Sequence, residues 1–393
     1  MATTYSDTIT TTNLPDALRT FYSAQLEFTA RQMMVFDQFA EVKTDFQAER
    51  GQQVVWTIYR QMAPTIGPLT ENQDVDGGQI SDFQVSFTVD EYGHAVGTTR
   101  KIDALSYHGP ISEIVRQLLA PQMALTLDTL ARNAAWAGAP KRYAGGAANR
   151  AALTATDVAT IDVIKQAAFR LAVNRVPLMN GSYVCVCHPA VIYDLKEDSE
   201  WENAGVYSDP QRLMTGEVGR IHGVRFVESH NARLANAGGN ETETTLSAQA
   251  AYGTTTLLVA DASGFSVGDE VTIYDAAQSA PDGTGVNEEN VIIKQISGNT
   301  LTLEKGTLRA HASGSKVRKA IDIYPLMFLG GEKPYGKGVV IPPQVVVALP
   351  TDKLRRINYV GWYALLGYGT IRDWTYEVVE CAASQDAKYI FGF

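Results

Sequence analysis

Two short runs, VVWTIY at residues 54–59 and FQVSFTV at residues 83–89, decide how this chain folds. The second run alternates apolar and polar side chains, which is the period of a strand with one buried face. The first is a β-branched and aromatic run that favours a strand as well. Between them lies APTIGPLTENQDVDGGQ (63–79), rich in proline, glycine and acids and without a core pattern. We therefore predict two strands joined by a long polar excursion, an arm that projects from the body; a connection of this length is usually functional or disordered.

A long helix is predicted next along the chain, over residues 110–137. Ile111, Val115 and Leu118 recur at helical spacing on one face. Pro121 interrupts this stripe, and a proline inside a helix costs about 3 kcal/mol and kinks or restarts it. We expect either one bent helix or two helices in tandem.

The regions on either side of the hairpin and helix have patterns of their own. Residues 1–13 are Thr-rich and aperiodic, which indicates an extended arm, and a short helix should follow. Helix, strand and helix patterns follow one another closely over 158–173, 183–187 and 188–195, which predicts an α/β subdomain. After Asp322 come strands rich in aromatic residues, which we expect to form a closing sheet against the long helix.

Residues 241–319 differ from the chain before and after them. Short strand patterns alternate with Gly, Asn and Asp turns, and Gly298-Asn299 between two of them predicts a two-residue hairpin. The segment holds ten acidic and six basic residues and so carries −4 of the formal net charge of −10. We predict an inserted, acidic, all-β domain.

The composition limits the classes of protein. The chain has 393 residues, 45% hydrophobic and 19% charged, which is enough for a sizeable core and for two to four domains. A net charge of −10 is the wrong sign for a dedicated nucleic-acid binder, although a local basic patch stays open. The polar start predicts no signal peptide, and no apolar run reaches the roughly 18–20 residues that span a bilayer.

No motif in the sequence predicts catalysis or a cofactor. There is no H-E-x-x-H and no P-loop, and the one G-x-S-x-G match, Gly264–Gly268, lies among the short strand patterns of 241–319 and not in the strand-to-helix turn that the motif requires. Cys185, Cys187 and His188 form the nearest approach to a metal motif, but Cys381 is the only other thiol, and a strand would place His188 opposite the two cysteines. We therefore expect core cysteines in a reducing cytoplasm. The acids around Asp74 favour a solvated loop over a calcium site.

Three stretches carry a resemblance to a known family. They are YRQMAPTIGPLTENQDVDGGQISDFQVSFTVDEYGHAV (59–96), GRIHGVRFVESHNA (219–232) and YVGWYALLGYGTIRDWTYEVVECAAS (359–384). Together with the order of the predicted parts, they resemble the major capsid proteins of tailed phages, which have the Johnson fold, and are similar to the capsid family of phage N-four and its relatives. The resemblance covers almost the whole chain except 241–319.

The resemblance implies an α+β fold with named parts. These are an N-terminal arm and helix (1–49), an extended loop (50–104), a spine helix with peripheral domain (105–154), an axial domain (155–240), the inserted β domain (241–319), a return to the axial domain (320–350) and a peripheral closing sheet (351–393).

The resemblance also implies a function, which is to assemble into hexamers and pentamers of an icosahedral shell around double-stranded DNA, in the virion, after assembly in the bacterial cytoplasm. Expected partners are further copies of the chain, a separate scaffolding protein, a portal, a decoration protein as a further candidate, and packaged DNA through weak contacts, but no membrane. We expect Pro121 to be a hinge during shell expansion. Contacts between subunits are expected on the excursion and the strand after it, at Thr65, Leu69, Asp74, Asp82 and Phe83.

Two other functions stay open from the sequence. One is a tail or decoration protein that uses 241–319 as a carbohydrate-binding module, which predicts trimers. The other is a cytoplasmic hydrolase, which requires an acid–base constellation that the sequence does not display.

Overall fold

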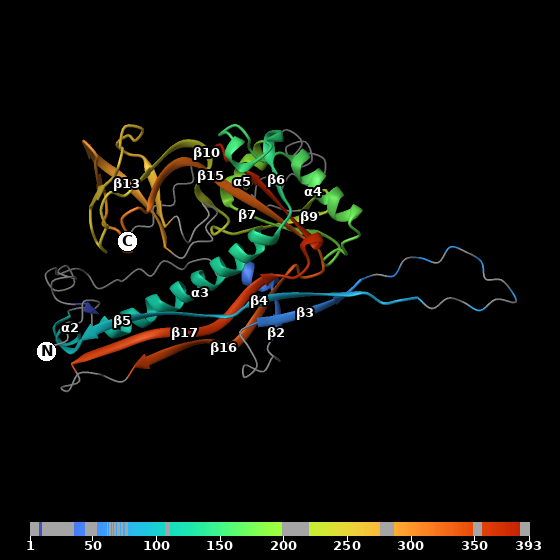
Figure 1. The fold of residues 1–393 in the computed structure, drawn as a ribbon, viewed down its shortest axis with the longest axis horizontal. Helices are drawn as coiled ribbons and strands as arrows, with labels where there is room; N and C mark the ends of the chain where they lie inside the picture. The colour runs from blue at the N-terminus through green and yellow to red at the C-terminus, as the bar shows by residue number, and fades with distance from the viewer. Residues whose placement is uncertain are drawn as a thin grey trace, which may run out of the picture. The chain divides into compact units, whose positions relative to one another are not determined.

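Both predicted strands and the long helix are present in a computed structural model of the chain (Figure 1). The structure describes residues 8–9, 35–43, 53–60, 78–106, 111–198, 220–275, 287–348 and 356–385, and the single residues 62, 64, 66, 68, 71 and 74. The expected N-terminal helix and most of the expected arm lie outside these residues.

The chain divides into two units. The hairpin unit comprises residues 1–33, 40–127 and 335–371, and the α/β unit comprises residues 34–39, 128–334 and 372–393. One of the boundaries falls inside the long helix α3 (Ile111–Gly138), which therefore contributes to both units.

The hairpin unit is built on a long antiparallel pair, β16 (Tyr335–Ala348) and β17 (Ile357–Thr370). The pair sits in a five-stranded sheet of order β1-β5-β17-β16-β2, in which β5 is Asp90–Thr99. The edge strands β1 (Thr8–Ile9) and β2 (Glu41–Lys43) are short and parallel to their neighbours. Alternate residues of β17 are buried, as the period of a strand dictates: Val360, Trp362, Ala364 and Leu366.

The predicted strand pair is confirmed as β3 (Gln53–Tyr59) and β4 (Asp82–Thr88), a two-stranded antiparallel hairpin. Alternate residues of β3 face apolar residues of β4, the third such pair being Ile58 and Phe83, so one face of the ribbon is apolar. Val54 lies opposite Phe87, and Trp56 lies opposite Val85. The ring of Trp56 stacks on Phe87 with centroids 5.1 Å apart.

The base of this hairpin packs on glycines of β16 and β17. A Cβ atom on Gly338 would lie 2.6 Å from Val54 Cγ2, and one on Gly367 would lie 2.1 Å from the carbonyl oxygen of Thr88. Real Cβ contacts are not this short, so only glycine lets the ribbon lie directly on the sheet. Val54, Trp56, Val89 and Ile371 form the buried cluster at this junction.

Helix α3 runs unbroken through Pro121, so of the two expected alternatives the structure has a single helix and not two in tandem. It follows the short helix α2 (Arg100–Leu105), whose N-terminus is capped by the Thr99 side chain. Directly after the proline, the side-chain oxygen of Gln122 accepts a hydrogen bond of 2.6 Å from the indole nitrogen of Trp362. This bond ties the proline turn of α3 to β17.

The α/β unit contains the predicted helix–strand–helix, here α4 (Ile161–Val173), β7 (Tyr183–Cys187) and α5 (Pro189–Glu197). They belong to an eleven-stranded sheet in which β15 (Lys316–Leu329) pairs with several strands. Its other strands are β6 (Lys141–Tyr143), β8 (Arg220–Ile221), β9 (Val224–Glu228), β10 (Leu234–Thr245), β11 (Thr256–Leu258), β12 (Glu270–Tyr274), β13 (Glu288–Ser297), β14 (Thr300–Leu303) and β18 (Tyr376–Cys381).

The strands expected to form one closing sheet belong to two different sheets. β17 pairs with β16 and β5, whereas β18 pairs with β15 and β6. The short turn at Asp373–Thr375 carries the chain from the first sheet to the second. β15 and β16 also fall in different units, which divide after Pro334. Aromatic composition alone does not distinguish strands of two sheets, which accounts for this error.

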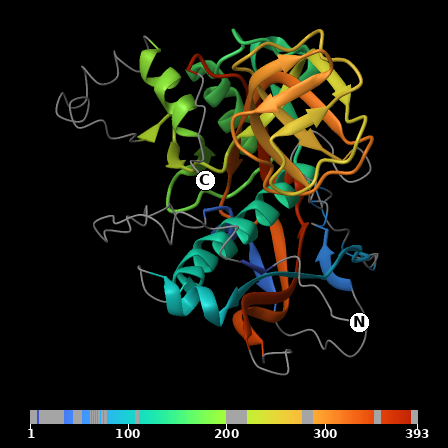
Figure 2. The same ribbon diagram turned by 90° about the vertical axis from the view of Figure 1, so that its left-hand side faces the viewer.

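The short strands within 241–319 enclose a core of their own, which includes Leu257, Ile273, Ile293 and Leu301. We call residues 246–315 the β lobe; Figure 2 shows its yellow and orange strands grouped together. The predicted hairpin at Gly298 is confirmed, with Ser297 opposite Thr300. The lobe lies between two strands of the larger sheet: β10 ends at Thr245, directly before it, and β15 begins at Lys316, directly after it. No helix among the described residues is long and apolar enough to cross a membrane.

Candidate functional site

The hairpin presents apolar side chains that no described neighbour covers. Tyr59 is 70% exposed, Ile80 is 73% exposed, and Ile66 in the excursion is 89% exposed. Among the described residues β3 and β4 pair only with each other, so each has an open edge. An open edge and exposed apolar residues are the usual means by which a strand adds to another chain.

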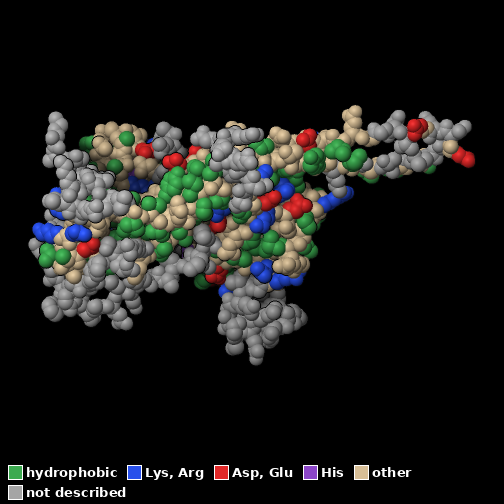
Figure 3. Space-filling view, turned by 90° about the horizontal axis from the view of Figure 1, so that it is seen from below, with side chains coloured by type: hydrophobic (Ala, Val, Ile, Leu, Met, Phe, Trp, Pro, Cys, Tyr) green, Lys and Arg blue, Asp and Glu red, His purple; other side chains and the backbone are tan. Residues whose placement is uncertain are grey.

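Three of the five predicted contact residues are described. Asp74 and Asp82 are exposed, and Phe83 is half-buried with the Arg60 guanidinium 5.5 Å from its ring centroid. Thr65 and Leu69 lie outside the described residues. Figure 3 shows acidic side chains towards the outer end of this projection and apolar ones nearer its base. The role of these residues in contacts between subunits stays a prediction.

A second apolar edge, which the sequence reasoning missed, lies at the far end of β16. Val345, Val346 and Val347 are 59%, 41% and 57% exposed. β2 covers the outer edge of β16 only at Gly336–Gly338, so in the described part of the chain the later residues have a partner on one side alone. Three consecutive valines near the end of a strand are the signal that could have identified it.

The Cys185-Val-Cys187-His188 motif is part of the core. All three cysteines of the chain are fully buried, and they belong to one apolar cluster beneath α4 and α5, which confirms the core prediction. Burial raises the pKa of the Cys185 and Cys381 thiols well above their usual value, so neither is a ready thiolate. Among the described residues no group of three His, Cys, Asp or Glu side chains is placed to hold a metal ion.

His188 has a structural task instead. Its Nδ1 accepts a hydrogen bond of 3.1 Å from the backbone N–H of Ala190 and so caps α5. Its ring lies 5.0 Å from that of Tyr324 and 5.9 Å from that of His230. Burial, together with the nearby His230 and Arg233, lowers the pKa of His188 to about 4.

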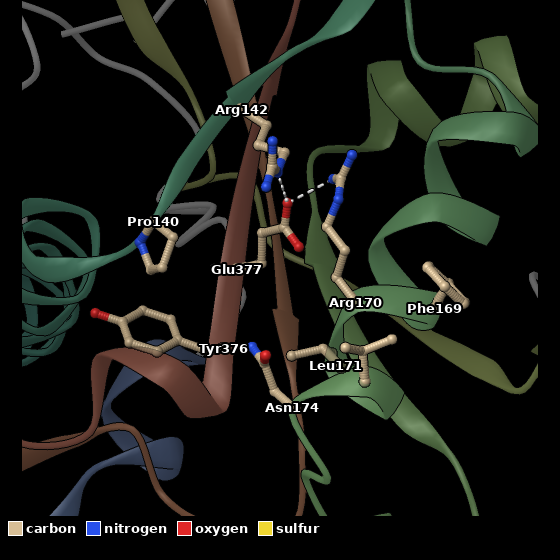
Figure 4. A pocket seen from close by; sticks show the side chains of 9 residues that line it. Pro140, Arg142, Phe169, Arg170, Leu171, Asn174, Tyr376 and Glu377 are labelled. Carbon is tan, nitrogen blue, oxygen red and sulfur yellow. Dashed lines mark hydrogen bonds and ion pairs between the residues drawn. The ribbon is translucent and has the colours of Figure 1, made fainter.

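A shallow cavity of about 180 Å³ lies between α4, β6 and β18 (Figure 4). Arg142 and Arg170 point towards Glu377 from opposite sides, and both bind its Oε1, at 2.8 and 2.7 Å. Beside them Phe169 is 67% exposed. Two guanidinium groups hold this carboxylate from opposite sides, an arrangement that fixes α4 and β6 to β18.

Comparisons with known proteins give one consistent answer. The family model described as phage capsid protein matches residues 128–272. A chain in the capsid structure of the cyanophage P-SCSP1u superposes with a TM-score of 0.58 at 13% identity, over 94% of this chain and 95% of that chain. No curated protein matches in sequence.

Two further solved structures are similar to the same extent. The capsid of Ralstonia phage GP4 matches with a TM-score of 0.57 at 14% identity, over 94% of this chain and 96% of that chain. The capsid of cyanophage Pam1 matches with a TM-score of 0.57 at 12% identity, over 94% of this chain and 98% of that chain.

Proposed function

We propose that this chain is a phage capsid protein, the subunit that builds the hexamers and pentamers of an icosahedral shell around double-stranded DNA; its fold and the family match over residues 128–272 support this. The observation that carries the proposal is the extent of the shared fold, because more than nine-tenths of this chain superposes on nearly the whole length of capsid chains. The role is mechanical: many weak, repeated contacts between copies add up around a closed shell.

The hairpin supports this role by its open edges and exposed apolar residues. We propose that residues 50–104 act as the extended loop and lie over a neighbouring copy, with Asp74, Asp82 and Phe83 among the contacts. A copy that covers Ile66 and Ile80 would remove their apolar surface from water, worth roughly 25 cal/mol for each Å² buried. The division into axial, peripheral and inserted domains is part of the same proposal.

We further propose that Pro121 is a hinge of α3 during shell expansion. A proline leaves one backbone carbonyl of the helix without its intrahelical donor, and this is a common site of bending. Its position a few residues before the boundary between the units at Leu127 supports the assignment. A separate scaffolding protein, a portal and a decoration protein are the remaining partners that this role requires or allows.

Electron microscopy of the purified full chain tests the proposal. We expect closed shells, or hexamers and pentamers, on their own or with a co-expressed scaffolding protein. Trimers that bind carbohydrate would identify a tail or decoration protein instead, and a monomer with turnover would identify an enzyme.

A further inference from the structure

Strand β6 presents its side chains to two different hollows of the α/β unit. Arg142 points into the cavity with Glu377 (Figure 4), whereas its neighbours on the strand line a second hollow of about 400 Å³. The side chains that line this second hollow, here called the basic hollow, come from β6, the turn after it, β10 and β15: Lys141, Tyr143, Asn149, Arg150, Ala151, Ala237 and Arg318.

The residues that line the basic hollow include hydrogen-bond donors and no Asp or Glu. All of its charged lining residues are cations, and its other polar lining residues are an amide and a phenol. These are the side chains that contact phosphate oxygens in protein–nucleic acid complexes. The chain as a whole has a net charge of −10, so the charge of this hollow is opposite in sign to that of the chain.

The nearest carboxylates have cationic partners. Glu380 is buried and holds Arg150 through two hydrogen bonds, of 2.6 and 2.5 Å, which fixes the plane of the guanidinium. Glu243, which lies opposite Arg318 across the β10–β15 pair, binds the ammonium of Lys316 at 2.5 Å and the hydroxyl of Tyr274 at 2.6 Å. Arg318 itself donates a hydrogen bond of 3.0 Å to the carbonyl oxygen of Gly239 and also interacts with Glu243. The four cations Lys141, Arg150, Lys316 and Arg318 outnumber the two carboxylates, so these groups together keep a net positive charge.

We propose that the basic hollow binds phosphate groups of the double-stranded DNA backbone. The proposal rests on the proposed function, which supplies the DNA, and it names residues for a contact that the overall charge disfavours. Lys141 and Arg318 supply the charge, the fixed Arg150 supplies a planar donor, and Asn149 and Tyr143 complete the ring of donors. Binding of this kind is independent of base sequence and sensitive to salt, because it releases counterions from the duplex.

The test measures the affinity of the full-length, unassembled chain for a short DNA duplex over a series of salt concentrations. For the double variant Lys141→Ala and Arg318→Ala we expect weaker binding and a log K against log salt slope shallower by about 2, since each phosphate contact contributes about 0.9. The matched control is Lys294→Ala with Lys305→Ala, which removes two exposed cations from the β lobe. The control should bind as the unaltered chain does.

Either of two results with these alanine variants would overturn the inference. One is an equal loss in both double variants, which would mean that net charge alone matters. The other is that a peptide of residues 63–79 binds better than DNA and loses affinity in the same variant, which would make the hollow an acceptor for acidic protein segments.

The conservative pair Lys141→Arg with Arg318→Lys separates charge from folding. It keeps both cations, so it should retain affinity and slope, and loss of DNA binding in this folded variant would also refute the proposal. Failure of the unaltered chain to form shells bears on the proposed function and leaves the DNA-binding measurement valid.

Discussion

The α/β unit and the hairpin unit bury their apolar residues in different ways. In the α/β unit, α4 and α5 cover the sheet, and residues such as Ile164, Leu195 and Phe328 are fully buried. In the hairpin unit, the ribbon rests on glycines at its base, while Ile66 and Ile80 are exposed further out. The difference is that helices cover the central cluster of the first unit, whereas the ribbon of the second leaves Ile66 and Ile80 exposed, where the proposed neighbouring copy would cover them.

The largest effect is expected from Asp128→Ala in the α/β unit. Oδ1 of this buried carboxylate accepts the backbone N–H groups of Val35, Phe36 and Asp37 at 2.8, 2.7 and 3.3 Å, and Oδ2 accepts the amide of Asn231 at 2.9 Å. Truncation removes this acceptor from all four donors in a buried place, so the free energy of unfolding should fall by about 3 kcal/mol or more.

Urea denaturation of the unassembled chain, followed by circular dichroism, measures this change. The control is Asp162→Ala at the exposed start of α4, which should cost less than about 1 kcal/mol. Equal losses in the two variants would show that Asp128 does not hold the segment at Val35.

Gly367→Ala should disrupt the packing of the hairpin base on β17. The added Cβ would lie 2.1 Å from the carbonyl oxygen of Thr88, a backbone atom that moves only with its strand. We expect a loss of 1–3 kcal/mol, about the usual cost of overpacking, and a larger loss of shell assembly than of secondary structure.

The matched control for this variant is Gly78→Ala. There the added Cβ meets only the terminal methyl group of Met62, at 3.0 Å, which a flexible side chain can accommodate. Melting temperature and particle yield distinguish the two variants. Unchanged assembly in Gly367→Ala would mean that the hairpin does not pack closely on Gly367.

Acid should destabilise the α/β unit through His188. Its pKa is lowered to about 4 in the folded chain from 6.5, so the unfolded chain binds the proton more readily between these values. Stability is therefore present at neutral pH and is lost as pH falls from about 6.5 towards 4, by roughly 2 kcal/mol between pH 7 and pH 5.

His188→Asn tests the assignment, because asparagine also caps helices but does not titrate. The unfolding free energy of this variant should depend less on pH over the same window. An unaltered pH profile would assign the acid sensitivity to other groups.

Ile80→Ser should leave the isolated subunit nearly unchanged and impair assembly. This side chain is 73% exposed, and exposed substitutions usually change stability by less than about 0.5 kcal/mol. Val267→Ser on the β lobe, at 64% exposure, is the control and should assemble normally. Particle yield by sedimentation separates them, and normal yield from Ile80→Ser would remove this residue from the contact surface.

The smallest effect on shell assembly is expected from deletion of the β lobe, although this removes more residues than any other change. Thr245 and Lys316 are partners in the β10–β15 pair, so residues 246–315 can be replaced by an Asn-Gly turn that joins them. The core of the β lobe leaves with the segment, and the cluster around Cys185 stays. We expect shells to form, and a folded subunit without shells would show that the β lobe carries contacts between copies.

Local pattern was sufficient for the elements whose signals lie within a few residues. The alternation at Phe83–Val89, the turn at Gly298 and the helical stripe from Ile111 each specify their own geometry, because backbone period and turn conformation are local properties. The same reasoning failed where two sheets share one composition, as for β17 and β18.

By itself, then, the sequence determined the strand pair, the long helix, the acidic β segment and, through resemblance, the capsid fold. Tertiary structure alone decided which distant residues come together: Asp128 at the backbone of Phe36, Gly367 against Thr88, and Lys141 and Arg318 around one hollow. The physical reason is that these contacts depend on strand register and on the packing of layers, which join residues far apart in the chain and leave no period in the sequence. The open edges of the hairpin belong to the same class, because an edge is defined only once the order of strands is known.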